Sequence, residues 1–215
     1  MAAFEPVHEA GVWGIELDVR WTKDLHPVVI HDADTRRVFN VDMVIAEVTL
    51  DELLRRVPEI PTLTQVVERF GGRIHLMVEL KYIVTSNKEL HSRRLQHIFS
   101  SLSAGDDYHF IALHTELFDF VGFAGESAFL PVAEFNVQQF SRVALERKLA
   151  GISGQYLLLS NKMIQRHHLR KQKIGAGFPA SRFSFYRELN RGVDWIFTNH
   201  ALKLRSIQQE LFRNR

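Results

Sequence analysis

The sequence predicts a single α/β domain over residues 1–215, built on a mostly parallel β-sheet. Short apolar segments rich in β-branched residues alternate along the chain with longer helical patterns, which is typical of βαβ units. Polar side chains recur where the predicted strands end, and no linker, low-complexity segment or internal repeat interrupts the chain. About seven such strands fit either a doubly wound sheet or a (β/α)8 barrel that lacks one strand.

The predicted elements of the first part of the chain are bounded by turn and capping residues. Gly11 is a natural helix end, and Thr49 with Glu52 resembles a capping box. Thr62 is a typical N-cap for the helix that follows it. The predicted helices are 1–10, 49–57 and 63–70, the predicted strands are 13–20, 28–32 and 73–81, and 33–46 is a predicted loop.

The second part of the chain continues the alternation of helix and strand. The predicted helices are 87–101, 137–150, 161–171, 184–191 and 202–213, and the predicted strands are 109–114, 129–134, 154–159, 173–178 and 193–198. Gly175 and Gly177 lie late in the chain and are followed by Phe178 and Pro179, which does not fit a Gly-rich loop for a dinucleotide or phosphate.

The composition excludes several classes of protein. A hydrophobic fraction of 46% and a net charge of only +2 are ordinary for a globular chain, and they predict no nucleic-acid partner. The basic run 166–173 is interpreted as a solvated helix face. The sequence has no cysteine, no transmembrane segment and no secretory signal, so we expect neither disulfide nor thiol chemistry and a cytoplasmic protein.

Glu16 and Asp18 alternate within an apolar run that is typical of a strand. Residues two apart in a strand share a face, so both carboxylates point the same way. Two like charges on a mostly buried strand repel each other and are costly to desolvate, and a bound divalent cation would resolve that conflict. A half-exposed strand with a solvated acidic face would resolve it as well, so the spacing alone leaves both interpretations open.

The polar residues at predicted strand ends are Glu16, Asp18, His31, Glu79, Lys81, His114, Glu134 and Asn199. A (β/α)8 barrel keeps its active site at the carboxyl ends of its strands. Three carboxylates that converge there would make a coherent metal-assisted hydrolase site.

Several motifs together resemble the glycerophosphodiester phosphodiesterase family, in order and spacing, over essentially the whole chain. The matching segments are Gly14-Ile15-Glu16-Leu17-Asp18-Val19, Pro27-Val28-Val29-Ile30-His31-Asp32, Ile60-Pro61-Thr62-Leu63, Val78-Glu79-Leu80-Lys81 and Gly192-Val193-Asp194-Trp195-Ile196-Phe197-Thr198-Asn199. The resemblance implies a TIM barrel. It also implies metal-dependent hydrolysis of a small-molecule glycerophosphodiester to an alcohol and glycerol 3-phosphate, in lipid and glycerol metabolism.

The same resemblance implies a role for individual residues. Glu16, Asp18 and Glu79 match the carboxylates that hold a divalent cation, Mg²⁺ or Ca²⁺, and such hard cations prefer oxygen ligands. His31 matches a general acid and base, and Lys81 matches a lysine that stabilises charge on the phosphate.

The chain departs from the family pattern at its start. The family has a strand with His-Arg-Gly upstream of the helix that contains Phe4, whereas this sequence begins at that helix. The resemblance therefore implies a barrel without its first strand and without one catalytic histidine, for which neither His8 nor His26 is a replacement. Two hypotheses follow: an active enzyme of which this sequence is a truncated form, or a truncated or degenerate member that acts as a non-catalytic binding domain.

Other conspicuous residues are interpreted structurally. The sequence predicts that His167 and His168 lie on the surface and that His114 is a core histidine with satisfied hydrogen bonds. The aromatic residues predicted to pack in the core, rather than to line an apolar slot at the barrel mouth, are Phe178, Phe183, Phe185 and Trp195.

Overall fold

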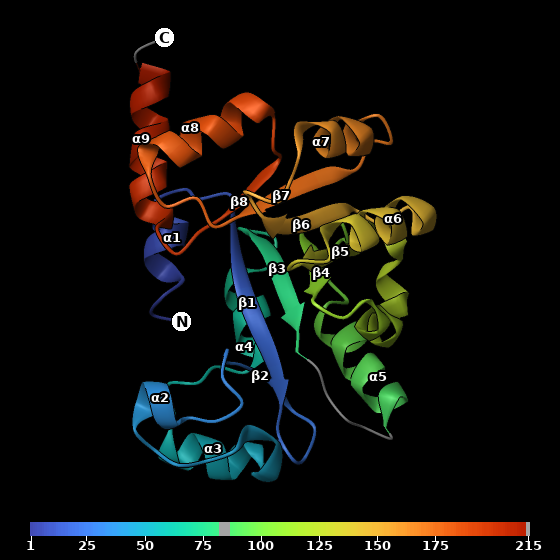
Figure 1. The fold of residues 1–215 in the computed structure, drawn as a ribbon. Helices are drawn as coiled ribbons and strands as arrows, with labels where there is room; N and C mark the ends of the chain where they lie inside the picture. The colour runs from blue at the N-terminus through green and yellow to red at the C-terminus, as the bar shows by residue number, and fades with distance from the viewer. Residues whose placement is uncertain (82–86, 214–215) are drawn as a thin grey trace.

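The computed structural model describes residues 1–81 and 87–213, and a curled eight-stranded sheet forms its centre (Figure 1). The strand order is β2-β1-β3-β4-β5-β6-β7-β8, and all neighbours are parallel except the antiparallel pair β1 and β2. The strands are β1 Gly14–Trp21, β2 Pro27–Val29, β3 His75–Leu80, β4 Tyr108–Ala112, β5 Phe129–Ala133, β6 Gly151–Gln155, β7 Lys173–Gly177 and β8 Trp195–Phe197.

Helices connect the parallel strands and pack on the outside of the curl (Figure 1). The α-helices are α1 Glu5–Glu9, α2 Arg36–Phe39, α3 Leu50–Arg56, α4 Leu63–Phe70, α5 Lys88–Ile98, α6 Val137–Arg147, α7 Asn161–His168, α8 Arg182–Arg191 and α9 Ala201–Arg213, and short 3₁₀ helices span Ile45–Glu47, Thr115–Ala124 and Glu126–Ala128. Most predicted elements are confirmed to within a few residues at each end.

The predicted helix starts are confirmed in atomic detail. Thr49 and Glu52 form a capping box at α3, and Thr62 and Gln65 form another at α4. Each box satisfies backbone N–H groups that would otherwise have no partner at a helix start. The apolar face of α4, with Phe70 at its end, is buried against the sheet.

Two predictions about elements are wrong. The predicted loop 33–46 contains the single turn α2 and the start of a 3₁₀ helix. The predicted strand 154–159 begins three residues earlier, as β6, and its leucines lie in the following loop. The prediction failed here because β6 is rich in glycine. A Cβ at Gly154 would lie only 3.0 Å from the carbonyl oxygen of Ala133, so β6 needs small residues and lacks the apolar pattern of a strand.

Several side-chain predictions are also wrong. His167 is fully buried, where its ring bonds the Ser141 hydroxyl and the Gln172 side-chain oxygen, both at 2.8 Å. These partners satisfy a neutral imidazole, which explains how a polar helix can bury it. His114 is exposed instead of buried. Of the four aromatic residues, Phe178 and Phe183 are exposed, Phe185 is buried and Trp195 is half-buried.

The barrel is open between β8 and β1, since no ladder joins these two strands within the described ranges. The Trp13 and Trp195 rings stack across the opening with 5.7 Å between centroids. The Arg205 side chain on α9 donates to the carbonyl oxygen of Ala10, and α1 lies beside α9 (Figure 1). The predicted α/β barrel with a missing strand is confirmed.

Among residues 1–81 and 87–213, no helix combines the length and the apolar character needed to cross a bilayer.

A pair of buried histidines lies at the end of the sheet where the strands begin. His75 at the start of β3 and His109 on β4 are joined by a 2.8 Å hydrogen bond, and the His75 ring also bonds the carbonyl oxygen of Asp106. A carbonyl only accepts, so Nδ1 of His75 carries a proton and its Nε2 accepts from Nδ1 of His109. Burial, and then the facing His75, lowers the pKa of His109 to about 4.

This pair predicts a loss of stability in acid. Histidine in an unfolded chain has a pKa near 6.5, so between pH about 6.5 and 4 the unfolded state binds more protons than the folded state. Stability is therefore expected to fall as the pH drops through this window, by about 3 kcal/mol, and to level off below it. Urea unfolding at several pH values measures this slope. A His109→Gln variant should have a shallower slope, whereas His97→Gln, at an exposed histidine, should keep that of the wild type.

Candidate active site

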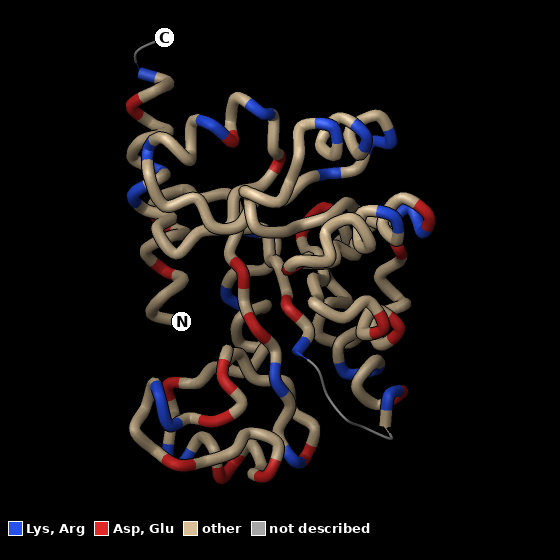
Figure 2. Tube along the Cα trace, in the orientation of Figure 1, with Lys and Arg blue, Asp and Glu red and all other residues tan. Residues whose placement is uncertain are grey.

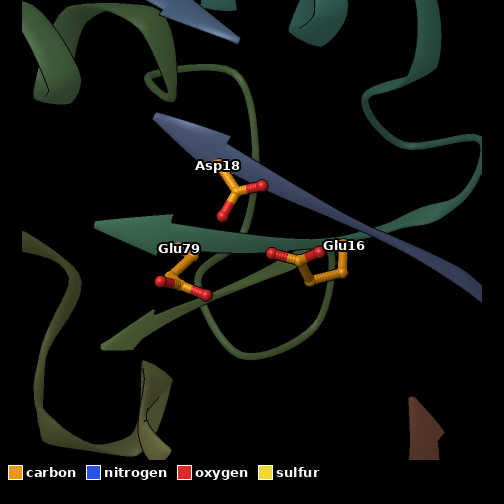
Figure 3. A group of neighbouring side chains, drawn as sticks. All are labelled: Glu16, Asp18 and Glu79. Carbon is orange, nitrogen blue, oxygen red and sulfur yellow. The ribbon is translucent and has the colours of Figure 1, made fainter. Parts of the chain in front are cut away.

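Three carboxylates face one another from two adjacent strands. Glu16 and Asp18 share one face of β1 because the residues between and beside them, Ile15, Leu17 and Val19, are buried on the other face. The parallel register of β1 and β3 places Asp18 directly beside Glu79. Figure 3 shows the three side chains pointing toward a common space, and one oxygen of each lies within 4.8 Å of the other two.

Lys81 bridges two of these carboxylates. Its ammonium lies 2.7 Å from the Asp18 carboxylate and 2.5 Å from that of Glu79, and all three side chains are largely enclosed. Burial alone would lower the pKa of Lys81, but its bonds to Asp18 and Glu79 outweigh this and raise it. Lys81 is therefore a fixed positive charge at the edge of the carboxylate group.

Glu16 is the member that Lys81 does not bridge. Its side chain is accessible from the cavity but enclosed by the wall of the barrel, and this desolvation, followed by repulsion from Asp18 and Glu79, raises the pKa of Glu16 to about 8. Lys81 opposes the shift but does not cancel it. The raised pKa of Glu16 thus reflects three carboxyl groups that face a single ammonium group, an imbalance of charge that a bound cation would relieve.

The donor set fits a hard divalent cation. Mg²⁺ and Ca²⁺ bind oxygen ligands at about 2.0–2.6 Å, so oxygens on opposite sides of one ion lie about 4–5 Å apart. One oxygen from each of Glu16, Asp18 and Glu79 lies within 4.8 Å of the other two. Lys81 uses one oxygen each of Asp18 and Glu79, which leaves a second oxygen on both. These three residues could hold the ion.

His31 follows β2 and lines the same cavity. Its Nδ1 lies 2.8 Å from the Asp32 carboxylate, and Arg37 donates to the other oxygen of Asp32 at 2.6 Å. Hydrogen bonds from Arg37 and His31 lower the pKa of Asp32 to about 2. With Asp32 ionised and bonded to Nδ1–H, Nε2 of His31 is left to accept a proton.

The structure therefore brings all five predicted site residues to one cavity, and their catalytic and metal-binding roles stay predictions. Glu134 and Asn199 line this cavity too, whereas His114 lies beside Glu116.

Acidic positions gather along β1 and β3 in the middle of the molecule, and basic positions are frequent on α7, α8 and α9 (Figure 2).

The sequence analysis missed Phe135 and the leucines of the cavity lining, and it assigned Phe178 to the core instead of to an apolar slot at the mouth. Phe135, Leu157, Leu158 and Phe178 line the cavity together with the carboxylates. The run Leu157-Leu158-Leu159 is apolar like a buried strand, and its position after a strand was the signal that could have assigned it to a loop.

A barrel-like parallel sheet whose polar side chains meet toward the carboxyl ends of its strands is typical of the TIM-barrel enzymes, which keep their active sites there. The model of the glycerophosphoryl diester phosphodiesterase family matches residues 1–203. The chain belongs to the glycerophosphodiester phosphodiesterase family.

Curated relatives agree with this assignment over part of their length. A glycerophosphodiester phosphodiesterase of Caldanaerobacter subterraneus is 38% identical over 93 residues, which cover 38% of each chain. One of Bacillus altitudinis is 34% identical over 92 residues, again 38% of each chain. The match thus spans only 38% of the length of these curated relatives.

The solved structures show the same fold. A glycerophosphodiester phosphodiesterase of Thermotoga maritima superposes with a TM-score of 0.78 at 23% identity, covering 94% of this chain and 88% of that one. A phosphodiesterase of Oleispira antarctica, in complex with the product sn-glycerol-3-phosphate, superposes with a TM-score of 0.77 at 18% identity, covering 95% and 90%.

Proposed function

We propose that this protein hydrolyses small glycerophosphodiesters to an alcohol and glycerol 3-phosphate, in lipid and glycerol metabolism, and that it needs a divalent cation, Mg²⁺ or Ca²⁺. The observation that carries the proposal is the group of three carboxylates with Lys81 at its edge, on β1 and β3. A cytoplasmic location stays a prediction.

The cavity residues have separate roles in the proposed reaction. The net reaction breaks the P–O bond to the alcohol, which leaves with a proton, while the oxygen of water ends on phosphorus. Lys81 stabilises negative charge that develops on the phosphate oxygens. His31, oriented by Asp32, accepts or returns the proton. A cation held by Glu16, Asp18 and Glu79 would supply Lewis-acid stabilisation of the phosphate.

Hydrolysis of glycerophosphocholine tests this proposal. We expect release of choline and glycerol 3-phosphate in the presence of Mg²⁺ or Ca²⁺, and complete loss of turnover when EDTA removes the metal. Restoring the metal should restore turnover. Turnover that persists in EDTA would contradict the metal role, and its absence with either metal would contradict the activity.

One observation favours a second candidate function. His31 is the single histidine among the described residues that line the cavity, whereas hydrolysis requires both a proton acceptor and a proton donor. A domain that binds a phosphodiester without hydrolysing it would be consistent with this. It predicts that a divalent cation raises the melting temperature although no product forms.

A further inference from the structure

Arg20 lies on the same face of β1 as the two carboxylates of that strand. Side chains alternate between the faces of a strand, so Glu16, Asp18 and Arg20 form one row, with about 6.6 Å from each position to the next. Arg20 is half-buried at the end of this row. Its guanidinium forms no ion pair within residues 1–81 and 87–213, so no carboxylate there explains why an arginine stands at this position.

The hydrogen bond of Arg20 goes to the backbone of His31. Nε of Arg20 donates to the carbonyl oxygen of His31 at 2.8 Å, 11 residues further along the chain. The amide of Ile30 donates to the carbonyl oxygen of Asp18 at 3.1 Å. Because β2 ends at Val29, these two bonds extend the attachment of the chain to β1 past the end of the strand ladder.

Few packing contacts hold the His31 ring in place, since its side chain is 67% exposed. Its bond to Asp32, which Arg37 fixes in turn, sets how the ring is turned within its own segment. The bond from Arg20 instead sets where that segment lies relative to β1. Proton transfer needs a donor and an acceptor about 2.6–3.2 Å apart, so the position of so exposed a ring depends on both sets of bonds.

We infer that Arg20 is a positioning residue, which holds His31 at the distance from the carboxylate group that proton transfer to or from the phosphodiester requires. This inference rests on the proposed function and adds one residue to it. Arg20 acts through the backbone of His31 and does not touch the substrate. A charged donor bonds a carbonyl more strongly than a neutral one, and lysine would keep such a donor whereas methionine would keep only the apolar stem.

The test compares kcat and KM for glycerophosphocholine, in Mg²⁺ or Ca²⁺, among the wild type, Arg20→Met and Arg20→Lys. We expect Arg20→Met to lower kcat by about tenfold to thirtyfold and to keep KM within about twofold, because a misplaced proton-transfer group weakens the transition state and not the bound substrate. Arg20→Lys should stay within about threefold of the wild-type kcat. Arg55→Met is the matched control, since Arg55 is an exposed arginine on α3 that pairs with Asp51 and should leave both constants unchanged.

A second comparison shows whether Arg20 acts through His31. In a His31→Ala background the proton-transfer group is absent, so Arg20→Met should lower the remaining kcat by no more than about twofold. A full further loss in that background overturns the positioning role. So does a raised KM at unchanged kcat, which would mean that Arg20 binds the phosphate directly, and so do unchanged kinetics in Arg20→Met. Each of these results leaves the proposed function intact.

NMR relaxation of the backbone gives a readout that needs no turnover. The order parameter of the His31 N–H bond should be about 0.85 in the wild type and in Arg55→Met, and should fall below about 0.6 in Arg20→Met. If the wild type does not hydrolyse glycerophosphocholine, the proposed function fails and this order parameter decides whether Arg20 fixes His31. A fall supports that part of the inference, and an unchanged value overturns it.

Discussion

Replacing Asp18 by asparagine is expected to lower kcat/KM for glycerophosphocholine by about a thousandfold. Asp18 contributes a proposed cation ligand and one of the two bonds that fix Lys81, so its loss affects both positive charges that would face the phosphate. The wild type should gain about 2.7 kcal/mol of stability at a metal concentration about 100 times Kd, or about 5–10 °C in melting temperature. Asp18→Asn should lose this gain, which thermal unfolding with and without Mg²⁺ measures.

Asp42→Asn is the control for this variant. Asp42 is an exposed carboxylate that pairs with Arg36 outside the cavity, so both its kinetics and its metal-induced shift should match those of the wild type. If Asp18→Asn keeps the metal-induced shift, the cation binds elsewhere and the carboxylate group has another purpose.

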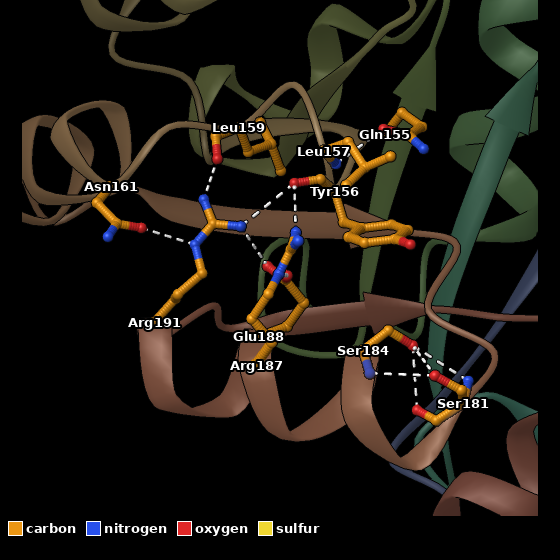
Figure 4. Close-up of polar contacts among 10 residues, drawn as sticks. All are labelled: Gln155, Tyr156, Leu157, Leu159, Asn161, Ser181, Ser184, Arg187, Glu188 and Arg191. Carbon is orange, nitrogen blue, oxygen red and sulfur yellow. Dashed lines mark hydrogen bonds and ion pairs between the residues drawn. The ribbon is translucent and has the colours of Figure 1, made fainter.

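Replacing Glu188 by glutamine is expected to lower the free energy of unfolding by about 3 kcal/mol, because the guanidinium groups of Arg187 and Arg191 would lose their buried counter-charge. The expected decrease in melting temperature is about 6–12 °C for a domain of this size. The variant should also loosen the loop that contains Leu157 and Leu158, because Arg191 bonds the backbone on either side of them (Figure 4).

An exposed glutamate separates this effect from a general change of charge. Glu146 lies on the surface of α6, and Glu146→Gln should change the melting temperature by less than about 2 °C. An equal decrease in both variants would mean that the cluster around Glu188 adds nothing specific to stability.

Much of the fold could be predicted because local signals agree with it. Thr49 and Thr62 mark helix starts, and the alternation of strand and helix defines the parallel sheet. The prediction failed at β6, where close approach of backbones demands Gly151 and Gly154 and so removes the apolar signal. It failed at His167 because Ser141, one of its two hydrogen-bond partners, lies on α6, and no local pattern links that helix to α7.

The candidate site also has features that could be predicted from the sequence and features that could not. The three carboxylates could be predicted, since Glu16 and Asp18 follow from strand periodicity and Glu79 follows from the family motif. The two bonds of Lys81 and the orientation of His31 by Asp32 depend on distances that a sequence does not contain. The two leucines of the cavity lining, Leu157 and Leu158, were missed because an exposed leucine and a buried one have the same residue type.

The open side of the barrel also affects how the site moves. Over residues 14–17, β1 pairs with β3 on one edge and with no strand on the other, within the described residues. Successive amides of a strand point to opposite edges, so every second amide in this segment should exchange with solvent hydrogen much faster than its neighbours. Glu16 therefore depends on a single ladder, whereas Asp18 is also held on the other edge by a hydrogen bond from the amide of Ile30 to its carbonyl oxygen. Whenever this part of β1 separates from β3, Glu16 moves away from Glu79, so the carboxylate group is complete only while the local structure is closed.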